Sequence, residues 1–177
     1  MCGGTRLANV TRRSSYLKGK AHTAKLRKKG RPPYLPPPRK GRRKQSVYAG
    51  LVYEKNLSNY LTSLFGEDKV IHGPWIEYED DQGYGVCQPD IVVLNEGEEA
   101  SLLVEAKLTY TKRAARLKLK KLYLPLVQLV WPDREWIMVQ ACKNINQHAR
   151  KYAFTKGIQT VRKQKPGSYI TWQWRPL

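Results

Sequence analysis

Residues 89–107, PDIVVLNEGEEASLLVEAK, decide the expected fold of this chain. The apolar runs at 91–94 and 102–104 have the composition of buried β-strands. Between them, the segment NEGEE at 95–99 is rich in turn-forming residues, so we predict an antiparallel hairpin. A hairpin of this kind brings the start of its first strand beside the end of its second strand.

Charged residues occupy the two ends that this hairpin brings together. Glu105 and Lys107 are two residues apart in the second strand, so both side chains leave the same face of the sheet. Asp90 opens the first strand and would fold back beside Glu105. Two carboxylates favour a hard divalent cation such as Mg²⁺, and a neighbouring ammonium can stabilise charge on a phosphate or hold the attacking water.

The order Pro89-Asp90 followed by Glu105-Ala106-Lys107 resembles the PD-(D/E)XK signature of the restriction-endonuclease-like nucleases, and is similar to its phage-type or resolvase-like members. The resemblance covers about residues 47–142. It implies an α/β fold with an αβββαβ core, in which helices flank a central mixed sheet. It also implies that Asp90, Glu105 and the backbone carbonyl of Ala106 bind Mg²⁺ or Mn²⁺, while Lys107 orients the attacking water.

The function implied by the resemblance is a metal-dependent DNA nuclease, most simply an endonuclease, that hydrolyses phosphodiester bonds in phage DNA processing or recombination. The alternative is a non-catalytic nucleic-acid-binding, virion or packaging protein on a nuclease-like scaffold. Intact acids and lysine favour the enzyme, because two neighbouring carboxylates without a cation repel each other. Gln128 and Gln140 stay outside the catalytic set, because neither aligns with a subgroup of the family.

A helix is expected at residues 47–65, because leucines recur along one face and Gly66 follows. Glu54 lies close to that apolar face, and in the resemblance it matches an extra metal-associated acid, which makes it a fourth catalytic candidate. A solvent-facing Glu54 paired with a lysine is the alternative. The other expected elements are a strand at 75–79, a basic amphipathic helix at 112–124 that Pro125 ends or bends, a strand at 136–142 parallel to the Glu105 strand, a helix at 146–154 and a strand at 168–174.

Basic residues divide the chain into two parts. The formal net charge is +19; residues 1–46 hold 15 Lys or Arg and no acid precedes Glu54, whereas the rest has 18 basic against 14 acidic residues. We therefore predict a disordered, proline-containing basic arm at 1–46, which becomes ordered only on a polyanion, and a nuclease-like domain at 47–177.

Nucleic acid is the expected partner of these charges, and a solvated tail, a targeting address or a solvated helix face is the alternative. The candidate DNA-binding residues are Arg12, Arg13, Lys28, Lys29, Arg42, Arg43 and Lys44 in the arm, and Lys112, Arg113, Arg116 and Lys120 in the helix that follows the Glu105 strand.

Other classes of protein fit the sequence poorly. The three cysteines and three histidines are scattered, which predicts reduced thiols and no structural zinc. No apolar run reaches the roughly 18–20 residues of a membrane span, and no signal-peptide core follows the start. We expect a soluble intracellular protein, in the host cytoplasm if phage-encoded, that is not secreted and has no membrane partner; a homodimer would suit a resolvase-like member.

Overall fold

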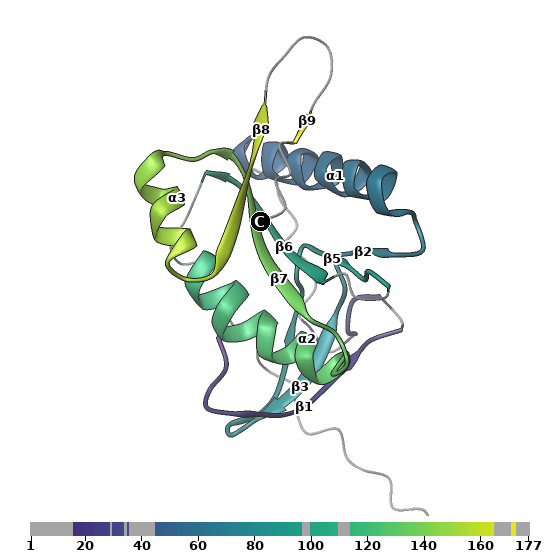
Figure 1. The fold of residues 1–177 in the computed structure, drawn as a ribbon. Coiled ribbons are helices and arrows are strands. Elements are labelled where there is room, and N and C mark those ends of the chain that lie inside the picture. The colour runs from purple at the N-terminus through teal and green to yellow at the C-terminus, as the bar shows by residue number, and fades with distance from the viewer. Residues whose placement is uncertain are drawn as a thin grey trace, which may run out of the picture.

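In the computed structural model, the described residues are 16–28, 30–33, 35, 45–96, 100–109, 114–164 and 171–172. They form a mixed α/β fold with two sheets (Figure 1). The smaller sheet has the order β1-β3-β4, and its strands are β1 (Ala21–Leu26), β3 (Ile76–Asp80) and β4 (Gly83–Cys87). The larger sheet has the order β2-β5-β6-β7-β8-β9, and its strands are β2 (Val70–His72), β5 (Ile91–Val93), β6 (Ser101–Thr109), β7 (Trp136–Asn144), β8 (Ile158–Gln164) and β9 (Thr171–Trp172).

Strand pairing in the larger sheet confirms the predicted hairpin. β5 pairs antiparallel with β6, and β6 pairs in parallel with β7 and β7 with β8, so the sheet is mixed. The helices are α1 (Gln45–Phe65), the π-helix η1 (Ala114–Tyr123), α2 (Leu124–Val130), which follows η1 without a break, and α3 (Gln147–Phe154). None of the helices in the described ranges is long and apolar enough to span a membrane.

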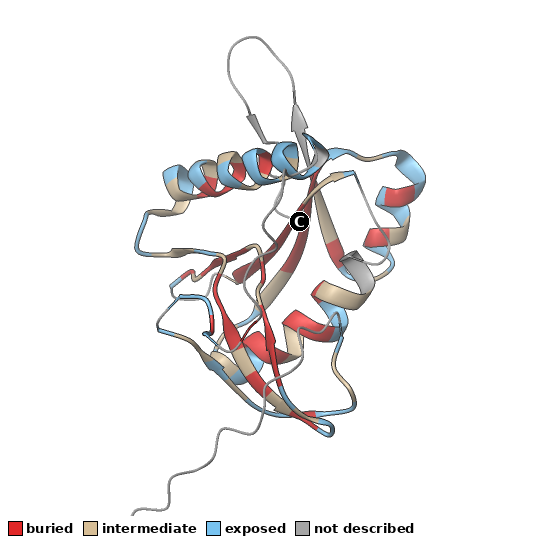
Figure 2. Cartoon of the chain, turned by 180° about the vertical axis from the view of Figure 1, so that it is seen from behind, coloured by how far each residue is buried: buried red, intermediate tan, exposed pale blue. Residues whose placement is uncertain are grey.

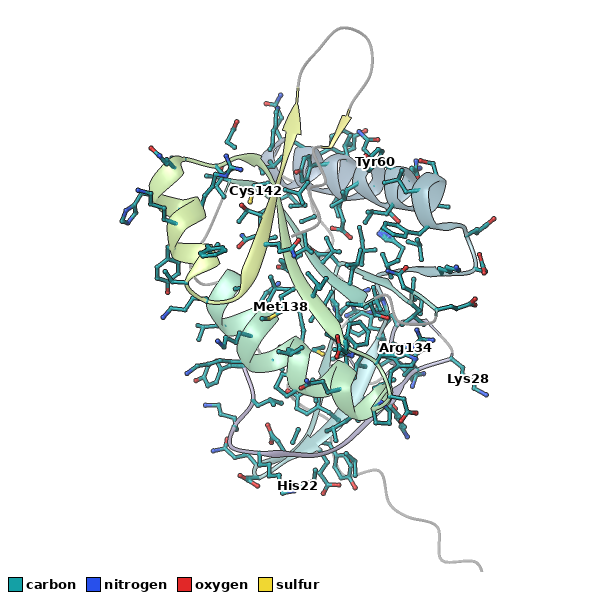
Figure 3. The ribbon with its side chains drawn as sticks, viewed as in Figure 1. His22, Lys28, Tyr60, Arg134, Met138 and Cys142 are labelled. Carbon is teal, nitrogen blue, oxygen red and sulfur yellow. The ribbon has the colours of Figure 1, made fainter. Side chains whose placement is uncertain are left out.

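Two apolar clusters fix the helices on opposite faces of the larger sheet. On one face, Leu57 and Leu61 of α1 pack in a cluster with Val104 of β6. On the other face, η1 and α2 contribute to a second cluster with Leu103 of β6 and Met138 of β7. Figure 2 shows the buried strands between the helices, and Figure 3 shows Met138 beside the η1–α2 helix. Alternate residues of β6 therefore face different helices.

The prediction of a wholly disordered arm at residues 1–46 is wrong, because β1 lies inside it. β1 pairs antiparallel with β3, and Arg27 of the arm forms an ion pair with Glu77 at 2.7 Å. The backbone N–H groups of Lys18 and Lys20 also donate to Asp80 and Asp81, at 2.9 and 2.8 Å. Acids on β3 and its turn, together with a free strand edge, supply the partners that the arm lacks in its own sequence.

Three further features differ from the predicted elements. β2, β4 and β8 were not predicted, and the strand expected at 75–79 is β3, which lies in the smaller sheet rather than beside β5. Pro125 does not end the helix, which continues to Val130. Pro125 falls in the first turn of α2, where the missing N–H is tolerated, so it marks the change from π-helix to α-helix.

Candidate active site

The hairpin brings Asp90 to Glu105, as predicted. The pair Ile91–Val104 belongs to the β5–β6 ladder, and Asp90 lies one step beyond it, opposite Glu105. The backbone N–H of Ala106 donates to Asp90 Oδ2 at 2.8 Å, which fixes the carboxylate against β6. Because Val104 and Ala106 pack toward α1, Glu105 and Lys107 project from the opposite face, beneath η1.

The ammonium of Lys107 lies among three oxygen groups. Its Nζ is 2.5 Å from Glu105 Oε1 and 3.5 Å from Asp90 Oδ2. It also donates to the backbone carbonyl of Ala106 at 2.9 Å. These are the three groups that the family resemblance assigns to the metal, so one positive charge already sits where the two carboxylates and the carbonyl converge.

A second lysine, Lys118 of η1, reaches the same carboxylate from the helix side. Its Nζ donates to Glu105 Oε1 at 2.9 Å. The sequence analysis did not single out Lys118, although the pattern held a signal. Lys118 directly precedes Leu119, and Leu119 and Leu122 are fully buried, so Lys118 borders the sheet-facing side of the helix.

Gln140 lies beside Glu105 on the neighbouring strand, since the two residues are paired in the parallel β6–β7 register. Both side chains are 0% exposed. In the described part of the chain, no group forms a hydrogen bond with Gln140 Oε1, Gln140 Nε2 or Glu105 Oε2. Sequence reasoning left Gln140 outside the catalytic set, and only the β6–β7 register places it next to the acid.

Glu54 lies near this cluster but does not join it. Its Oε1 is 3.2 Å from His72 Nε2 at the edge strand β2. The charges of Lys107 and Glu105 still act on Glu54. Over the described ranges, no three His, Cys, Asp or Glu side chains are grouped to hold a metal ion. Whether Glu54 acts as a metal ligand stays a prediction.

Burial is the main cause of the pKa shifts of Asp90 and Glu54. It raises the pKa of Asp90 to about 7, the Glu105 carboxylate adds to the rise, and Lys107 opposes it. Burial also raises the pKa of Glu54, against the effect of His72. For Lys107, burial alone would lower the pKa, but the carboxylates of Glu105 and Asp90 outweigh it and raise the pKa. Lys107 therefore stays charged, whereas Asp90 holds its proton more tightly than an exposed aspartate.

The donor atoms fit a hard divalent cation. Carboxylates and a backbone carbonyl are the oxygen ligands that Mg²⁺ and Mn²⁺ prefer. Asp90 Oδ2, Glu105 Oε1 and the carbonyl oxygen of Ala106 already share one cationic partner. The second oxygen of Glu105 adds a buried negative atom without a described partner.

Few of the DNA-binding candidates lie within the described residues. Lys28 and Lys120 are exposed, and Lys120 Nζ donates to the carbonyl of Lys156 at 3.4 Å. The position of Arg116 lies in η1, but its side chain is outside the description. Outside the described residues lie Arg12, Arg13, Lys29, Arg42, Arg43, Lys44, Lys112 and Arg113.

Comparisons of the chain with protein-family models, with curated proteins and with solved structures gave no match. The functional argument therefore depends on the geometry of the site itself.

Proposed function

We propose that this protein is a metal-dependent DNA nuclease that hydrolyses phosphodiester bonds, with a restriction-endonuclease-like core. One observation carries the proposal: the Lys107 ammonium contacts Glu105, Asp90 and the carbonyl of Ala106 at 2.5, 3.5 and 2.9 Å. An acid pair of this kind is costly to bury unless a cation balances it. Two acids, a carbonyl and a lysine in one place match the chemistry of phosphate hydrolysis.

Each residue has a role that its contacts support. Asp90, Glu105 and the Ala106 carbonyl would hold Mg²⁺ or Mn²⁺. When bound, the ion would polarise the phosphoryl oxygen and lower the pKa of a coordinated water. Lys107 would orient that water and stabilise the negative charge of the transition state, since its ammonium is already held in place by oxygen atoms.

The order of elements supports the same proposal. With β3 and β4 set aside, which lie between β2 and β5 in the chain, the order is helix, three strands, helix and strand: α1, β2, β5, β6, the η1–α2 helix and β7. In the larger sheet β2, β5, β6 and β7 are neighbours in that order, with β6 and β7 parallel. The smaller sheet would be an addition to this core, formed by β1 and the β3–β4 hairpin.

A specific observation favours the non-catalytic alternative. Glu105 Oε1 is already neutralised by two ammonium groups, those of Lys107 and Lys118, so the cluster can persist as a buried ion network without a metal. Mg²⁺ titration separates the two functions. A ligand present at 100 times its dissociation constant stabilises the folded state by about 2.7 kcal/mol, or about 5–10 °C in melting temperature for a chain of this size.

The nuclease predicts that Mg²⁺ raises the melting temperature and that Asp90→Ala abolishes the rise. The scaffold predicts no rise in either protein. Glu67→Ala is the matched control, because Glu67 is an exposed acid away from the site, and it should retain the full effect of Mg²⁺.

The direct test is incubation with supercoiled, linear, single-stranded and four-way-junction DNA, with and without Mg²⁺. Lys107→Ala should lower the cleavage rate at least about a hundredfold, since one lost electrostatic donor costs about 10²–10³ in rate. Lys143→Ala, an exposed lysine on β7, is the matched control and should cut like the wild type. Equal cleavage by Lys107→Ala and the wild type would reveal a contaminating nuclease and remove the catalytic assignment.

A further inference from the structure

Two ammonium groups share one oxygen at the centre of the site. Lys107 Nζ is 2.5 Å and Lys118 Nζ is 2.9 Å from Glu105 Oε1. The two lysines come from different elements, β6 and η1, and each side chain is about one-third exposed, at 31% and 33%. Glu105 itself is fully buried. Both lysines therefore contact a buried carboxylate while their side chains are partly open to the solvent from which a substrate arrives.

The two lysines differ in what else holds them. Lys107 has the carbonyl of Ala106 at 2.9 Å and Asp90 at 3.5 Å as further oxygen partners. For Lys118, the described contacts besides Glu105 are limited to the ring of Tyr123, whose centroid lies 5.8 Å from Nζ. A cation that binds Glu105 Oε1 would therefore release Lys118 more easily than Lys107.

The charge balance of the site also supports a role for Lys118 in binding substrate. Asp90 and Glu105 balance Lys107 and Lys118 when all four groups are ionised. A divalent cation leaves these groups with two positive charges in excess, or one when the nearby Glu54 is also ionised, which suits an anionic phosphodiester and the further charge of its transition state. If a divalent cation took Glu105 Oε1 as a ligand, the Lys118 ammonium would remain close enough to bind a phosphate oxygen held at the same site.

The helix that carries Lys118 is packed firmly against the sheet. η1 is a π-helix of ten residues, a form that is rare and often found at functional sites. Leu119 and Leu122 hold it against the sheet. Lys118 is thus anchored through its helix, while one-third of its side chain remains exposed.

We propose that Lys118 is a second catalytic lysine, which is held on Glu105 Oε1 until a divalent cation displaces it and which then binds a non-bridging oxygen of the scissile phosphate. The inference rests on the proposed nuclease function. It makes Lys118 both a competitor of the metal ion and a ligand of the substrate.

When the charge of Lys118 is removed, Mg²⁺ should bind more tightly because a competitor is lost, whereas DNA should be cleaved more slowly because a phosphate ligand is lost. The test requires both changes together. Lys118→Met keeps the apolar stem and removes the charge. Without DNA, the Mg²⁺ concentration that gives half of the thermal shift should fall at least about threefold, because Glu105 Oε1 loses a competing cation. At saturating Mg²⁺, the single-turnover rate of DNA cleavage should fall about a hundredfold.

Matched variants separate this role from a structural one. Lys121→Met, three residues along the same helix and exposed, should change neither quantity. Lys118→Arg should recover a large part of the cleavage rate, because it restores a positive charge. Should Lys118→Met not fold, Lys118→Gln provides the same two measurements, and circular dichroism identifies the folded variant.

The outcomes distinguish failure of this inference from failure of the nuclease assignment. Weaker Mg²⁺ binding by Lys118→Met, or cleavage at the wild-type rate, overturns the role of Lys118 while leaving Lys107 and the nuclease intact. Absence of cleavage by the wild type on every DNA tested overturns the nuclease and the phosphate role of Lys118 together.

Discussion

The two sheets both carry acid–base pairs, but in opposite surroundings. In the smaller sheet, His22 and Asp81 are 2.6 Å apart with half of each side chain exposed, at 50% and 51%. In the larger sheet, Glu105 is fully buried between two lysines. Exposed pairs contribute about 0–1 kcal/mol, whereas a buried pair is costly to desolvate. The exposed His22–Asp81 pair therefore contributes little beyond helping to attach β1, whereas the buried cluster needs a reason outside stability.

The largest expected difference between the sheets is in catalysis. Glu105→Gln should lower Mg²⁺-dependent DNA cleavage by more than about a hundredfold, because it removes a proposed metal ligand and the partner of both lysines. Asp81→Asn, an acid of the smaller sheet, should stay within about twofold of the wild type. Rates on supercoiled DNA measure both, and a similar loss in the two variants would show that the buried cluster has no special role.

Opposite pH dependence should distinguish the acids of the two sheets. Burial raises the pKa of Asp90 to about 7, so its contribution to stability is fully present below the unfolded pKa near 4 and is lost as the pH rises toward 7. Asp90→Asn, which can still accept from Ala106 N–H, should remove that loss. At pH 8 without metal it should stabilise the fold by on the order of 2 kcal/mol, since each pH unit corresponds to about 1.4 kcal/mol.

The pKa of Asp81 is shifted the other way. A hydrogen bond from the backbone N–H of Lys20 and the contact with His22 lower it, so its contribution is present at neutral pH and is lost on acidification. Denaturant unfolding of the wild type, Asp90→Asn and Asp81→Asn between about pH 2 and 8 measures both slopes, because the Asp81 contribution changes only below the unfolded pKa near 4. If both acids changed the unfolding free energy in the same direction as the pH rises, the contrast between the two sheets would be wrong.

Truncation tests whether β1 belongs to the fold. Removal of residues 1–35 deletes β1, exposes the β3 edge and strips Ala21 from the core cluster, which should cost at least about 2 kcal/mol of unfolding free energy. Removal of residues 1–15 leaves β1 in place and should change the melting temperature by less than about 2 °C. Equal stability of the two truncated proteins would show that β1 does not stabilise the fold, as the prediction of a disordered arm requires.

The smallest effect concerns single ion pairs of the smaller sheet. Arg27→Ala breaks the 2.7 Å pair with Glu77 and should cost about 1 kcal/mol, because both side chains are mostly buried. Lys25→Ala, whose contact with Glu77 is 3.5 Å and whose side chain is 72% exposed, should be close to neutral. Urea unfolding compares the two variants, and an Arg27 cost no larger than that of Lys25 would show that the Arg27–Glu77 pair does not help to hold β1.

Local patterns predicted what local forces control. The hairpin of β5 and β6, the apolar strand β7 and the helix α3 were all predicted, and Asn146 caps α3 by accepting from the N–H of Ala149 at 2.7 Å. The proximity of Asp90, Glu105 and Lys107 followed from the hairpin and from the period of two in a strand. These features depend on neighbours within about 20 residues of sequence.

Features that depend on residues far apart in the sequence were not predicted. β2 has three residues, too short for a periodic signal, and it forms because β5 offers a free edge. β1 has few apolar residues and becomes ordered through β3 and its acids, about 50 residues away. Gln140 is an ordinary polar residue in an apolar strand until the parallel register sets it beside Glu105.

By itself, the sequence determined which side chains share a face of β6, since that follows from the alternation of a strand, and it determined that two acids and Lys107 meet. Tertiary structure alone decided that Lys118 completes this group, that Gln140 borders it and that Glu54 turns to His72. The physical reason is the sequence separation over which each interaction acts. Strand alternation and hairpin closure act over a few residues, whereas the meeting of a helix with a sheet depends on how the whole core packs.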